Sequence, residues 1–180
     1  MPERLLEVKD LKVRFATEDG IVRAVDGVDF ELERGKVLGI VGESGSGKSV
    51  TAMTLLGLTR DKNTTFEGEV LYRDQDLLKL PESRLREVRG NEIAMIFQDP
   101  MTSLNPVYRI GEQIVEAIQA HEKVDDRAAR RRAVELLRQV GIPNPEARVD
   151  DFPHQFSGGM RQRAMIAMAL SCNPEILIAD

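Results

Sequence analysis

The chain has 180 residues, of which 42% are apolar and 31% charged, and its formal net charge is −5 at pH 7. These values are typical of a soluble globular protein with one sizeable core or two small ones, and the weak acidic charge argues against a general attraction to nucleic acid or anionic lipid. The apolar runs are too short to cross a bilayer, the first ten residues lack the apolar stretch of a secretory signal, and the single cysteine, Cys172, excludes an internal disulfide framework.

The first third of the chain is predicted to be β. Leu11, Val13 and Phe15 alternate with basic residues, and residues 28–32 repeat this alternation. Such a period of two is typical of strands with one buried face and one wet face. Turn sequences at 18–20 and 33–35 separate the predicted strands.

Three later runs, at residues 37–41, 93–97 and 176–179, are apolar without interruption. Short unbroken apolar runs indicate strands that are buried on both faces of a parallel sheet. Helical patterns lie between these runs, as expected for βαβ connections.

The helices are predicted at residues 110–120, 125–141 and 159–172. Asp125 or Asp126 can cap the second helix, and Gly141 ends it. Asn173–Pro174 stops the third, and the sequence between the second and third, 142–154, is predicted to be loop. The basic run Arg127 and Arg130–Arg132 is interpreted as a solvated helix face rather than a nucleic-acid site, because acidic residues flank it and no aromatic residues interleave it.

A glycine-rich segment, GESGSGKSV at residues 42–50, lies between the predicted strand 37–41 and an apolar helix, and it matches the phosphate-binding pattern G-x-x-x-x-G-K-[ST]. Glycines let backbone N–H groups curl around a triphosphate, and the helix that begins near Lys48 adds unpaired N–H groups and a positive dipole end. Lys48 is expected to reach the β- and γ-phosphates and the Ser49 hydroxyl to bind Mg²⁺. The residues expected to contact the nucleotide are Gly42, Ser44, Gly45, Ser46, Gly47, Lys48, Ser49 and Val50. This loop alone does not separate kinases, GTPases and motors.

A second candidate anion site is FSGGMRQR, residues 156–163, where Ser157 occupies an N-cap position before two glycines. With the phosphate-binding loop, this segment resembles the LSGGQ-x-R signature of the ATP-binding cassette (ABC) family; Phe156 replaces leucine and Met160 replaces glutamine. The resemblance implies a head-to-tail dimer with a homologous ATPase subunit, in which the signature of one subunit closes on the γ-phosphate bound by the other. The residues that carry this role by resemblance are Ser157, Gly158, Gly159 and Met160.

Together with that signature, the sequence at residues 96–114 resembles the ATPase subunits of bacterial oligopeptide and dipeptide importers. Gln98 matches the family's Q-loop glutamine, whose amide is implied to reach Mg²⁺ or the attacking water. ILIAD at the end of the chain resembles the Walker B strand, which implies that the Asp180 carboxylate holds the Mg²⁺ shell. By the same resemblance, Lys48, Gln98 and Asp180 are the candidate catalytic residues, and Ser49, Gln98 and Asp180 the candidate metal ligands.

The aromatic residue that stacks on adenine in this family aligns with Phe15. A ring face can stack on a base without any hydrogen bond. Phe15 could equally be a core residue, because its alternation partners Leu11 and Val13 are apolar.

The expected fold class is α/β: a P-loop NTPase with a RecA-like parallel sheet, an amino-terminal antiparallel β subdomain and an inserted helical subdomain. We expect a single incomplete ABC ATPase domain over residues 1–180, with residues 1–98 and 166–180 forming the β subdomain and P-loop core, and residues 99–165 the helical subdomain. In the family the cassette continues past the Walker B aspartate with a catalytic glutamate, a switch histidine and two more strands. His121 and His154 precede Asp180, so neither occupies the switch position, and His154 is assigned to the loop that supports the signature.

We therefore interpret the chain as a truncated product or a partial sequence, and expect it alone to hydrolyse ATP poorly and to leave a sheet edge bare beside residues 176–179. The expected function is the ATP-binding subunit of an ABC importer, and the resemblance to the oligopeptide and dipeptide branch implies that the imported substrate is a peptide. The implied ligands are ATP and Mg²⁺, the implied partners are transmembrane permease subunits and not nucleic acid, and the implied place is the cytoplasmic face of the inner membrane. Alternatives are a soluble ABC ATPase of DNA repair or translation, a non-ABC P-loop kinase, and a binding module without turnover.

Overall fold

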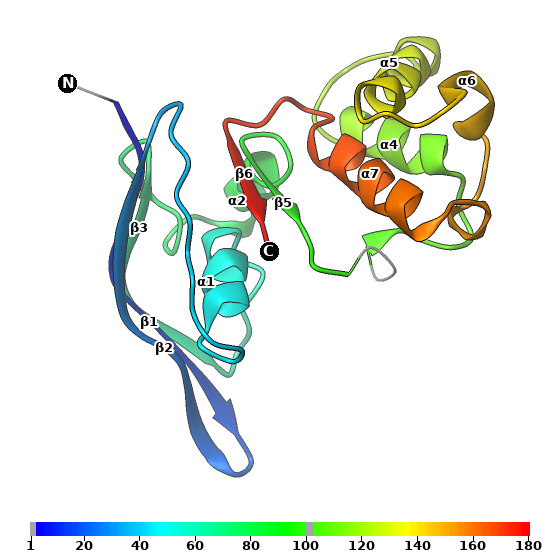
Figure 1. Ribbon diagram of the computed structural model, residues 1–180. Helices are drawn as coiled ribbons and strands as arrows, with labels where there is room; N and C mark the ends of the chain where they lie inside the picture. The colour runs from blue at the N-terminus through cyan, green and yellow to red at the C-terminus, as the bar shows by residue number, and fades with distance from the viewer. Residues whose placement is uncertain (1–2, 100–102) are drawn as a thin grey trace. The chain divides into compact units, whose positions relative to one another are not determined.

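The structure, a computed structural model, describes residues 3–99 and 103–180 of the chain. It divides into two compact units, residues 1–86 and residues 87–180 (Figure 1). Each unit contains a sheet of its own, and the two sheets differ in kind: the first is antiparallel and the second is parallel.

The first unit is built on an antiparallel sheet with strand order β2-β1-β3-β4. Its strands are β1 (Arg4–Thr17), β2 (Gly20–Glu33), β3 (Thr64–Tyr72) and β4 (Gln75–Asp76), and its helix is α1 (Lys48–Leu55). The alternation around Leu11 and Val13 is confirmed, since both side chains are fully buried on one face of β1. The predicted turn at 18–20 closes the β1–β2 hairpin, where Thr17 pairs with Gly20.

The second unit contains a pair of parallel strands and a group of helices. The strands are β5 (Ile93–Ile96) and β6 (Ile176–Ala179), and the pairing of Ile93 with Ile176 and of Ile96 with Ala179 confirms the predicted parallel sheet. The helices are α4 (Ile110–Gln119), α5 (Asp126–Gln139), α6 (Pro145–Arg148) and α7 (Gly158–Ala169), with a 3₁₀ turn at Pro153–Gln155. Helix α2 (Glu82–Val88) spans the boundary between the units.

Local signals explain the ends of α5. The Asp125 carboxylate accepts a hydrogen bond from the Ala128 N–H at 2.7 Å, which confirms it as the N-cap. Gly141 has a φ of 75°, and its N–H donates to the Arg138 carbonyl at 2.9 Å, so a glycine ends the helix as predicted. One apolar cluster, with Ile114 and Leu137 at its centre, joins α4, α5 and α7.

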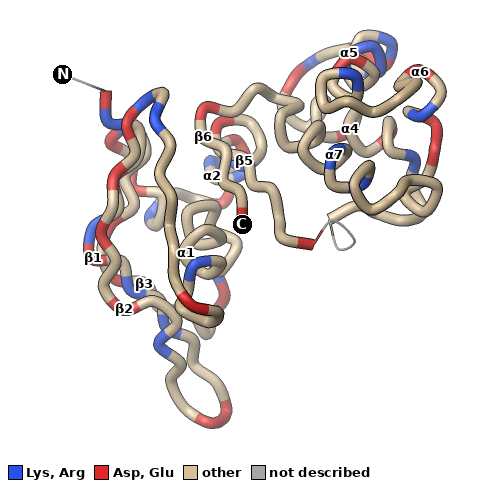
Figure 2. The backbone as a smooth tube through the Cα atoms, in the orientation of Figure 1, with Lys and Arg blue, Asp and Glu red and all other residues tan. Residues whose placement is uncertain are grey.

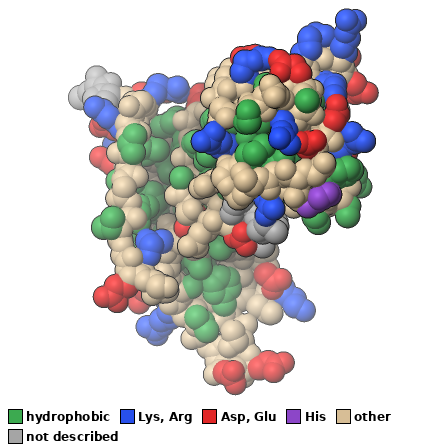
Figure 3. Space-filling model, turned by 45° about the vertical axis from the view of Figure 1, so that its right-hand side comes forward, with side chains coloured by type: hydrophobic (Ala, Val, Ile, Leu, Met, Phe, Trp, Pro, Cys, Tyr) green, Lys and Arg blue, Asp and Glu red, His purple; other side chains and the backbone are tan. Residues whose placement is uncertain are grey.

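The basic run on α5 lies among acidic partners. Arg130 donates to the Asp150 carboxylate at 2.6 Å, and Arg132 donates to both oxygens of Glu122. Figure 2 shows basic and acidic positions together along α5, and Figure 3 shows blue and red side chains intermixed over the helices. These contacts agree with a solvated, ion-paired face.

The prediction of a buried strand at residues 37–41 is wrong for the structure of the first unit. No strand is assigned there, and Val37 and Val41 are 98% and 94% exposed. The physical reason is pairing: a parallel strand needs a parallel neighbour for its hydrogen bonds, and the strands of this unit form an antiparallel sheet.

Other local expectations also need correction. The predicted loop 142–154 contains α6 and the start of the 3₁₀ turn, and Pro145 begins α6 because its fixed φ suits a first helical position. The third helix begins at Gly158 and ends at Ala169, before Asn173–Pro174. Strands β3 and β4 and helix α2 are not among the elements expected from the sequence, although Val70 and Tyr72 of β3 are buried at the spacing of two that a strand predicts. Within the residues that the structure describes, no helix has both the length and the apolar character needed to span a membrane.

We predict that Leu137→Ala lowers the free energy of unfolding by about 2–5 kcal/mol, because the Leu137 side chain is fully buried between helices and its loss leaves a cavity. Denaturant unfolding measures the change. The matched control is Arg131→Ala on the exposed face of the same helix, for which a change within about 0.5 kcal/mol is expected. Equal effects of the two substitutions would contradict the assigned core.

We also predict that the Cys172 thiol reacts slowly with iodoacetamide in the folded chain. Burial raises the pKa of this thiol, so less thiolate is present at any given pH, and the sulfur lies 3.7 Å from the Ala117 carbonyl. Alkylation at pH 8 should be at least about tenfold slower in the folded than in the denatured chain. Equal rates in native buffer and in denaturant would show that the thiol is accessible.

Candidate nucleotide-binding site

The phosphate-binding loop is fixed to the antiparallel sheet through Gly47. Gly47 precedes α1 with φ 90° and ψ 6°, a left-handed conformation that favours glycine. A Cβ at this position would lie 2.3 Å from the Ala24 carbonyl oxygen of β2. The loop therefore needs glycine here for two separate reasons, its backbone angle and its close approach to β2.

Lys48 closes the loop from inside. Its ammonium donates to the carbonyl oxygens of Gly42 and Glu43 at 2.8 and 2.7 Å, and to the Ser46 hydroxyl at 3.4 Å. A Cβ on Gly42 would lie 2.7 Å from the Ser46 Oγ, so the first glycine of the motif also stands where a side chain does not fit. The loop is thus already curled around the position of the lysine ammonium.

The amino-terminal end of α1 is suited to an anion. Thr51 N–H closes the first turn on the Gly47 carbonyl at 2.8 Å, no side chain caps the helix, and its first turn contains no acidic residue. The positive end of the helix dipole therefore faces the glycine loop without a neutralising carboxylate. Gly45, at φ 79°, supplies a further left-handed residue to the curl, while Ser44 lies exposed in the same turn.

Phe15 lies in the same unit as this loop, on β1. Its cross-strand neighbours are Val22 on β2 and Thr64 on β3. Phe15 is only half-buried, unlike Leu11 and Val13, and Val22 is 51% exposed. The Phe15 ring is therefore partly exposed to solvent and is not fully enclosed by the core of the sheet. Its exposed surface is available for a base to stack on.

Gln98 and Asp180 follow neighbouring parallel strands of the second unit. The pairing of Ile96 with Ala179 places both residues beyond the same, carboxyl end of the β5–β6 pair, and the Asp180 N–H donates to the Ile96 carbonyl at 3.1 Å. Both residues are exposed. Crevices at the carboxyl ends of parallel strands are where α/β proteins bind ligands.

The signature segment begins α7. The Ser157 Oγ accepts a hydrogen bond from the Met160 N–H at 3.3 Å, which confirms Ser157 as the N-cap. Gly158 and Gly159 are exposed, and a Cβ on either would meet nothing within 4 Å. While its oxygen caps the helix, the Ser157 hydroxyl can still donate its proton to an anion above the open helix end. Met160 packs against the helical core instead.

The structure thus brings the predicted residues together in three groups. Residues 42–50 and Phe15 share the first unit, Gln98 and Asp180 share one strand edge of the second unit, and residues 157–160 begin α7 in that unit. Two contacts of the predicted residues could not be predicted from the sequence. Val22 lies beside Phe15, which only the strand register shows, and carbonyl oxygens of the loop bind Lys48. The adjoining residues 100–102 lie outside the described part of the chain.

The chemistry of the predicted metal ligands is compatible with Mg²⁺: Ser49 lies in the first unit, and Gln98 and Asp180 lie in the second. The candidate ligands offer a hydroxyl, an amide and a carboxylate oxygen, which suit a hard cation that retains several waters and shares phosphate oxygens. No group of three or more His, Cys, Asp or Glu side chains able to hold a metal occurs among the described residues. The glycine positions and the open end of α1 match a polyphosphate in the same way.

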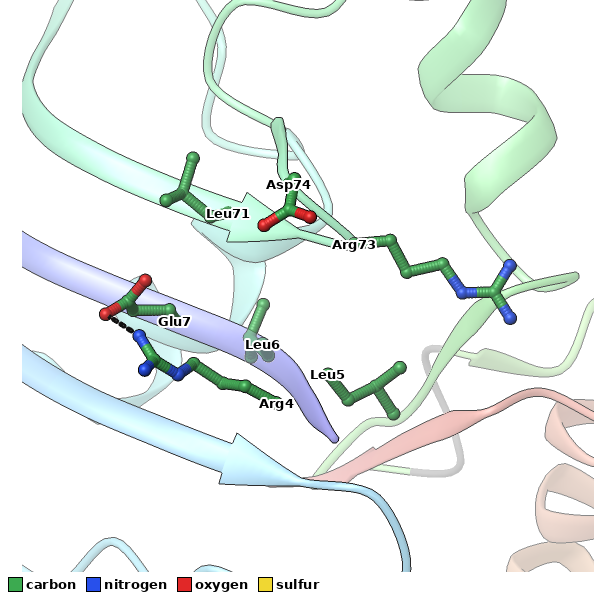
Figure 4. A pocket seen from close by; sticks show the side chains of 7 residues that line it. All are labelled: Arg4, Leu5, Leu6, Glu7, Leu71, Arg73 and Asp74. Atoms are coloured by element: carbon green, nitrogen blue, oxygen red, sulfur yellow. Dashed lines mark hydrogen bonds and ion pairs between the residues drawn. The ribbon is translucent and has the colours of Figure 1, made fainter. Parts of the chain in front are cut away.

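A hollow of about 300 Å³ lies elsewhere in the first unit, along β1 and β3 (Figure 4). The Arg4 guanidinium that borders it is hydrogen-bonded to Glu7, while Arg73 extends away from that pair. None of the predicted nucleotide-binding residues lines this hollow, so it does not belong to the candidate site.

Comparison with known proteins relates the chain to one family. The family model described as ABC transporter matches residues 25–180. The chain is 57% identical to the oligopeptide transport ATP-binding protein OppD of Bacillus subtilis over 98% of its length, and 56% identical to the dipeptide transport ATP-binding protein DppD of Lactococcus lactis over 99%. It spans about half the length of these relatives, 50% and 51%.

Solved structures give the same family. The ATP-binding cassette MJ0796, determined as a dimer in a post-hydrolysis state bound to ADP and phosphate, matches with a TM-score of 0.84 and 28% identity, over 98% of this chain and 73% of that one. CbiO1 of Clostridium perfringens, part of the ABC transporter complex CbiONQ, matches with a TM-score of 0.74 and 26% identity, over 99% and 65% of the two chains. The predicted α/β fold of a P-loop NTPase is thereby confirmed.

We predict that Gly47→Ala weakens nucleotide binding by about a hundredfold or more, because the new methyl group would force the loop away from the Ala24 carbonyl. Titration of a fluorescent ATP analogue measures this. Gly35→Ala is the matched control: Gly35 also has a positive φ, 72°, but a Cβ there meets nothing within 4 Å. If both substitutions weakened binding equally, backbone strain alone and not the contact with β2 would explain the loss.

Proposed function

The chain belongs to the ABC transporter family, and we propose that it is the ATP-binding and ATP-hydrolysing part of an importer of oligopeptides or dipeptides. The observation that carries the proposal is the pair of open helix ends: that of α1 behind the glycine loop and that of α7 at Ser157. The names of the relatives favour peptide import over a role in DNA repair or translation.

The first helix end binds the triphosphate. The loop amides of residues 42–47 and the end of the α1 dipole surround the β- and γ-phosphates, and Lys48 exchanges its loop carbonyls for phosphate oxygens. This exchange costs little, because both environments offer the ammonium several oxygen partners. Phe15 supports the base through ring stacking, which requires no hydrogen bond.

The second helix end completes the site from another subunit. A γ-phosphate carries dense negative charge, and the Ser157 hydroxyl with the N–H groups of the two exposed glycines offers donors that match it. A head-to-tail pair with a second ATPase subunit would place these donors opposite the glycine loop. ATP would then act as the joint between the subunits, and its hydrolysis would release them.

In hydrolysis, water attacks the γ-phosphorus of ATP, and the bond from that phosphorus to the β–γ bridging oxygen breaks, so this oxygen leaves with ADP while water supplies the new oxygen of the released phosphate. Mg²⁺, when bound, neutralises charge on the β- and γ-phosphate oxygens. The Ser49 hydroxyl, the Gln98 amide and the Asp180 carboxylate are the groups that would hold it, and the Gln98 amide can also orient the water. Lys48 stabilises the charge that develops on the leaving oxygen.

The remaining parts of the proposal concern partners and place. Separate permease chains would form the membrane path, and the helices between Gln98 and the signature would carry the closing motion to them. The chain would accordingly work on the inner side of the membrane as a peripheral subunit. Neither peptide contact nor nucleic-acid binding is assigned to any residue of this chain.

We predict that Ser157→Arg and Lys48→Ala in the full protein separate the two halves of the site. Ser157→Arg should abolish ATP-dependent dimerisation by steric blockade of the α7 end, yet leave nucleotide binding to the single subunit within about twofold. Lys48→Ala should weaken binding itself by about tenfold or more, because it removes a charge on the phosphates. Light scattering and nucleotide titration measure the two quantities.

Lys62→Ala, which changes an exposed lysine outside the loop, is the control and should leave both quantities unchanged. If Ser157→Arg chains still dimerised with ATP, the signature would have no place at the shared phosphate. If the wild-type protein and permeases copurified, but ATP changed neither their association nor the rate of transport, the transport proposal would fail.

A further inference from the structure

The start of α4 is bound to the segment that leads into the signature. Ile110 N–H donates to the Asp151 carbonyl at 2.9 Å and Gly111 N–H to the Val149 carbonyl at 2.8 Å. A Cβ on Gly111 would lie 2.3 Å from Val149 Cγ2, so the two segments are in direct contact. Two N–H groups of the first turn, which have no partner within the helix, thus bind backbone carbonyls of residues 149–151.

The Arg109 side chain makes three further contacts at this junction. Its guanidinium donates to the Asp150 carbonyl at 3.1 Å and lies 3.7 Å from the Asp150 carboxylate. It also lies over the Phe152 ring, 5.4 Å from the centroid, which is a cation–π distance. One side chain therefore contacts two residues that come shortly before Ser157.

The segment from Phe152 to Ser157 is held in place by several hydrogen bonds and by one buried ring. Phe152 N–H donates to the Gln155 side chain at 2.8 Å, and Phe156 N–H donates to the Pro153 carbonyl at 3.1 Å. The Phe156 side chain is buried in the helical core, and the Arg161 guanidinium of α7 donates to the same Pro153 carbonyl at 2.8 Å. A shift of Phe152 would therefore be passed on to the N-cap serine.

We propose that Arg109 is a positioning residue for the signature: through Asp150 and Phe152 it holds the 3₁₀ turn that sets the place of the Ser157 hydroxyl. Arg109 contacts no predicted nucleotide-binding residue, so it acts through the turn and not on ATP. This inference rests on the proposed function, because it is the γ-phosphate of a second subunit that Ser157 would meet.

Arg130 supplies a matched control within the same cluster. It donates to the Asp150 carboxylate at 2.6 Å and lowers the pKa of that carboxyl more than Arg109 does. Arg109, by contrast, contacts the Phe152 ring and the Asp150 carbonyl. If only the charge on Asp150 mattered, Arg130→Ala would have the larger effect. If the ring and the carbonyl matter, Arg109→Ala will have the larger effect.

The experiment compares Arg109→Ala, Arg109→Lys and Arg130→Ala in the full protein. Amide hydrogen exchange of peptides covering residues 150–160 is followed without nucleotide, with peptides of the glycine loop as an internal reference. The ATP concentration for half-maximal dimerisation and the nucleotide affinity of the single subunit are measured separately.

We expect Arg109→Ala to speed exchange in residues 150–160 by about three- to tenfold, as loss of a cation–π contact and an exposed ion pair allows. The ATP concentration for half-dimerisation should rise by a similar factor, while single-subunit nucleotide affinity stays unchanged. Arg109→Lys should restore part of both, and Arg130→Ala should match wild type.

Equal effects of Arg109→Ala and Arg130→Ala would overturn the assignment, because the lost charge beside Asp150 would then explain both. An equal rise in hydrogen exchange in the glycine loop would also overturn it, because the whole chain would then be loosened. The proposed function is judged separately. If wild-type protein fails to dimerise with ATP while Arg109→Ala still speeds local exchange, the dimer proposal falls and the role of Arg109 in holding the turn is supported.

Discussion

The close approach of Gly47 to the Ala24 carbonyl is the constraint on which the nucleotide site of the first unit depends. It fixes the end of the phosphate-binding loop against β2, and β2 in turn pairs with the strand that carries Phe15. In the proposed site, the phosphate end and the base end of a bound nucleotide would therefore be positioned by one sheet. Because backbone atoms make the contact, its geometry depends on the strand register and not on a flexible side chain.

The two helix ends solve the same problem in different ways. At α1 the loop curls around the Lys48 ammonium, so the candidate anion site already carries a positive charge, although residues 42–46 are exposed. At α7 a serine cap and two exposed glycines leave the end flat and open. A helix end preceded by a glycine loop that holds a lysine offers an anion several N–H donors and a positive charge, whereas an end with a serine cap offers fewer donors. This contrast suits the proposed site that two subunits would share.

The sequence predicted the features that depend on local chemistry. Asp125 and Gly141 bound α5 as expected, Ser157 caps α7, and Gln98 and Asp180 follow paired strands. It failed where tertiary pairing decides the outcome: apolar residues 37–41 form no strand in the first unit, and α6 occupies part of a segment rich in proline. The contacts of Arg109 with Asp150 and Phe152 join segments far apart in the chain, and no local pattern encodes such a contact.

The close contact between Gly111 and Val149 affects how sequence conservation in this family should be interpreted. Any side chain at position 111 would overlap both the valine methyl and its carbonyl oxygen, and the carbonyl overlap would persist whatever residue stood at position 149. Natural selection should accordingly hold this glycine almost invariant, for reasons of space alone. A ranking of positions by sequence conservation would then place Gly111 beside the residues of the functional site, although the cause of its conservation would be the close packing of two backbone segments.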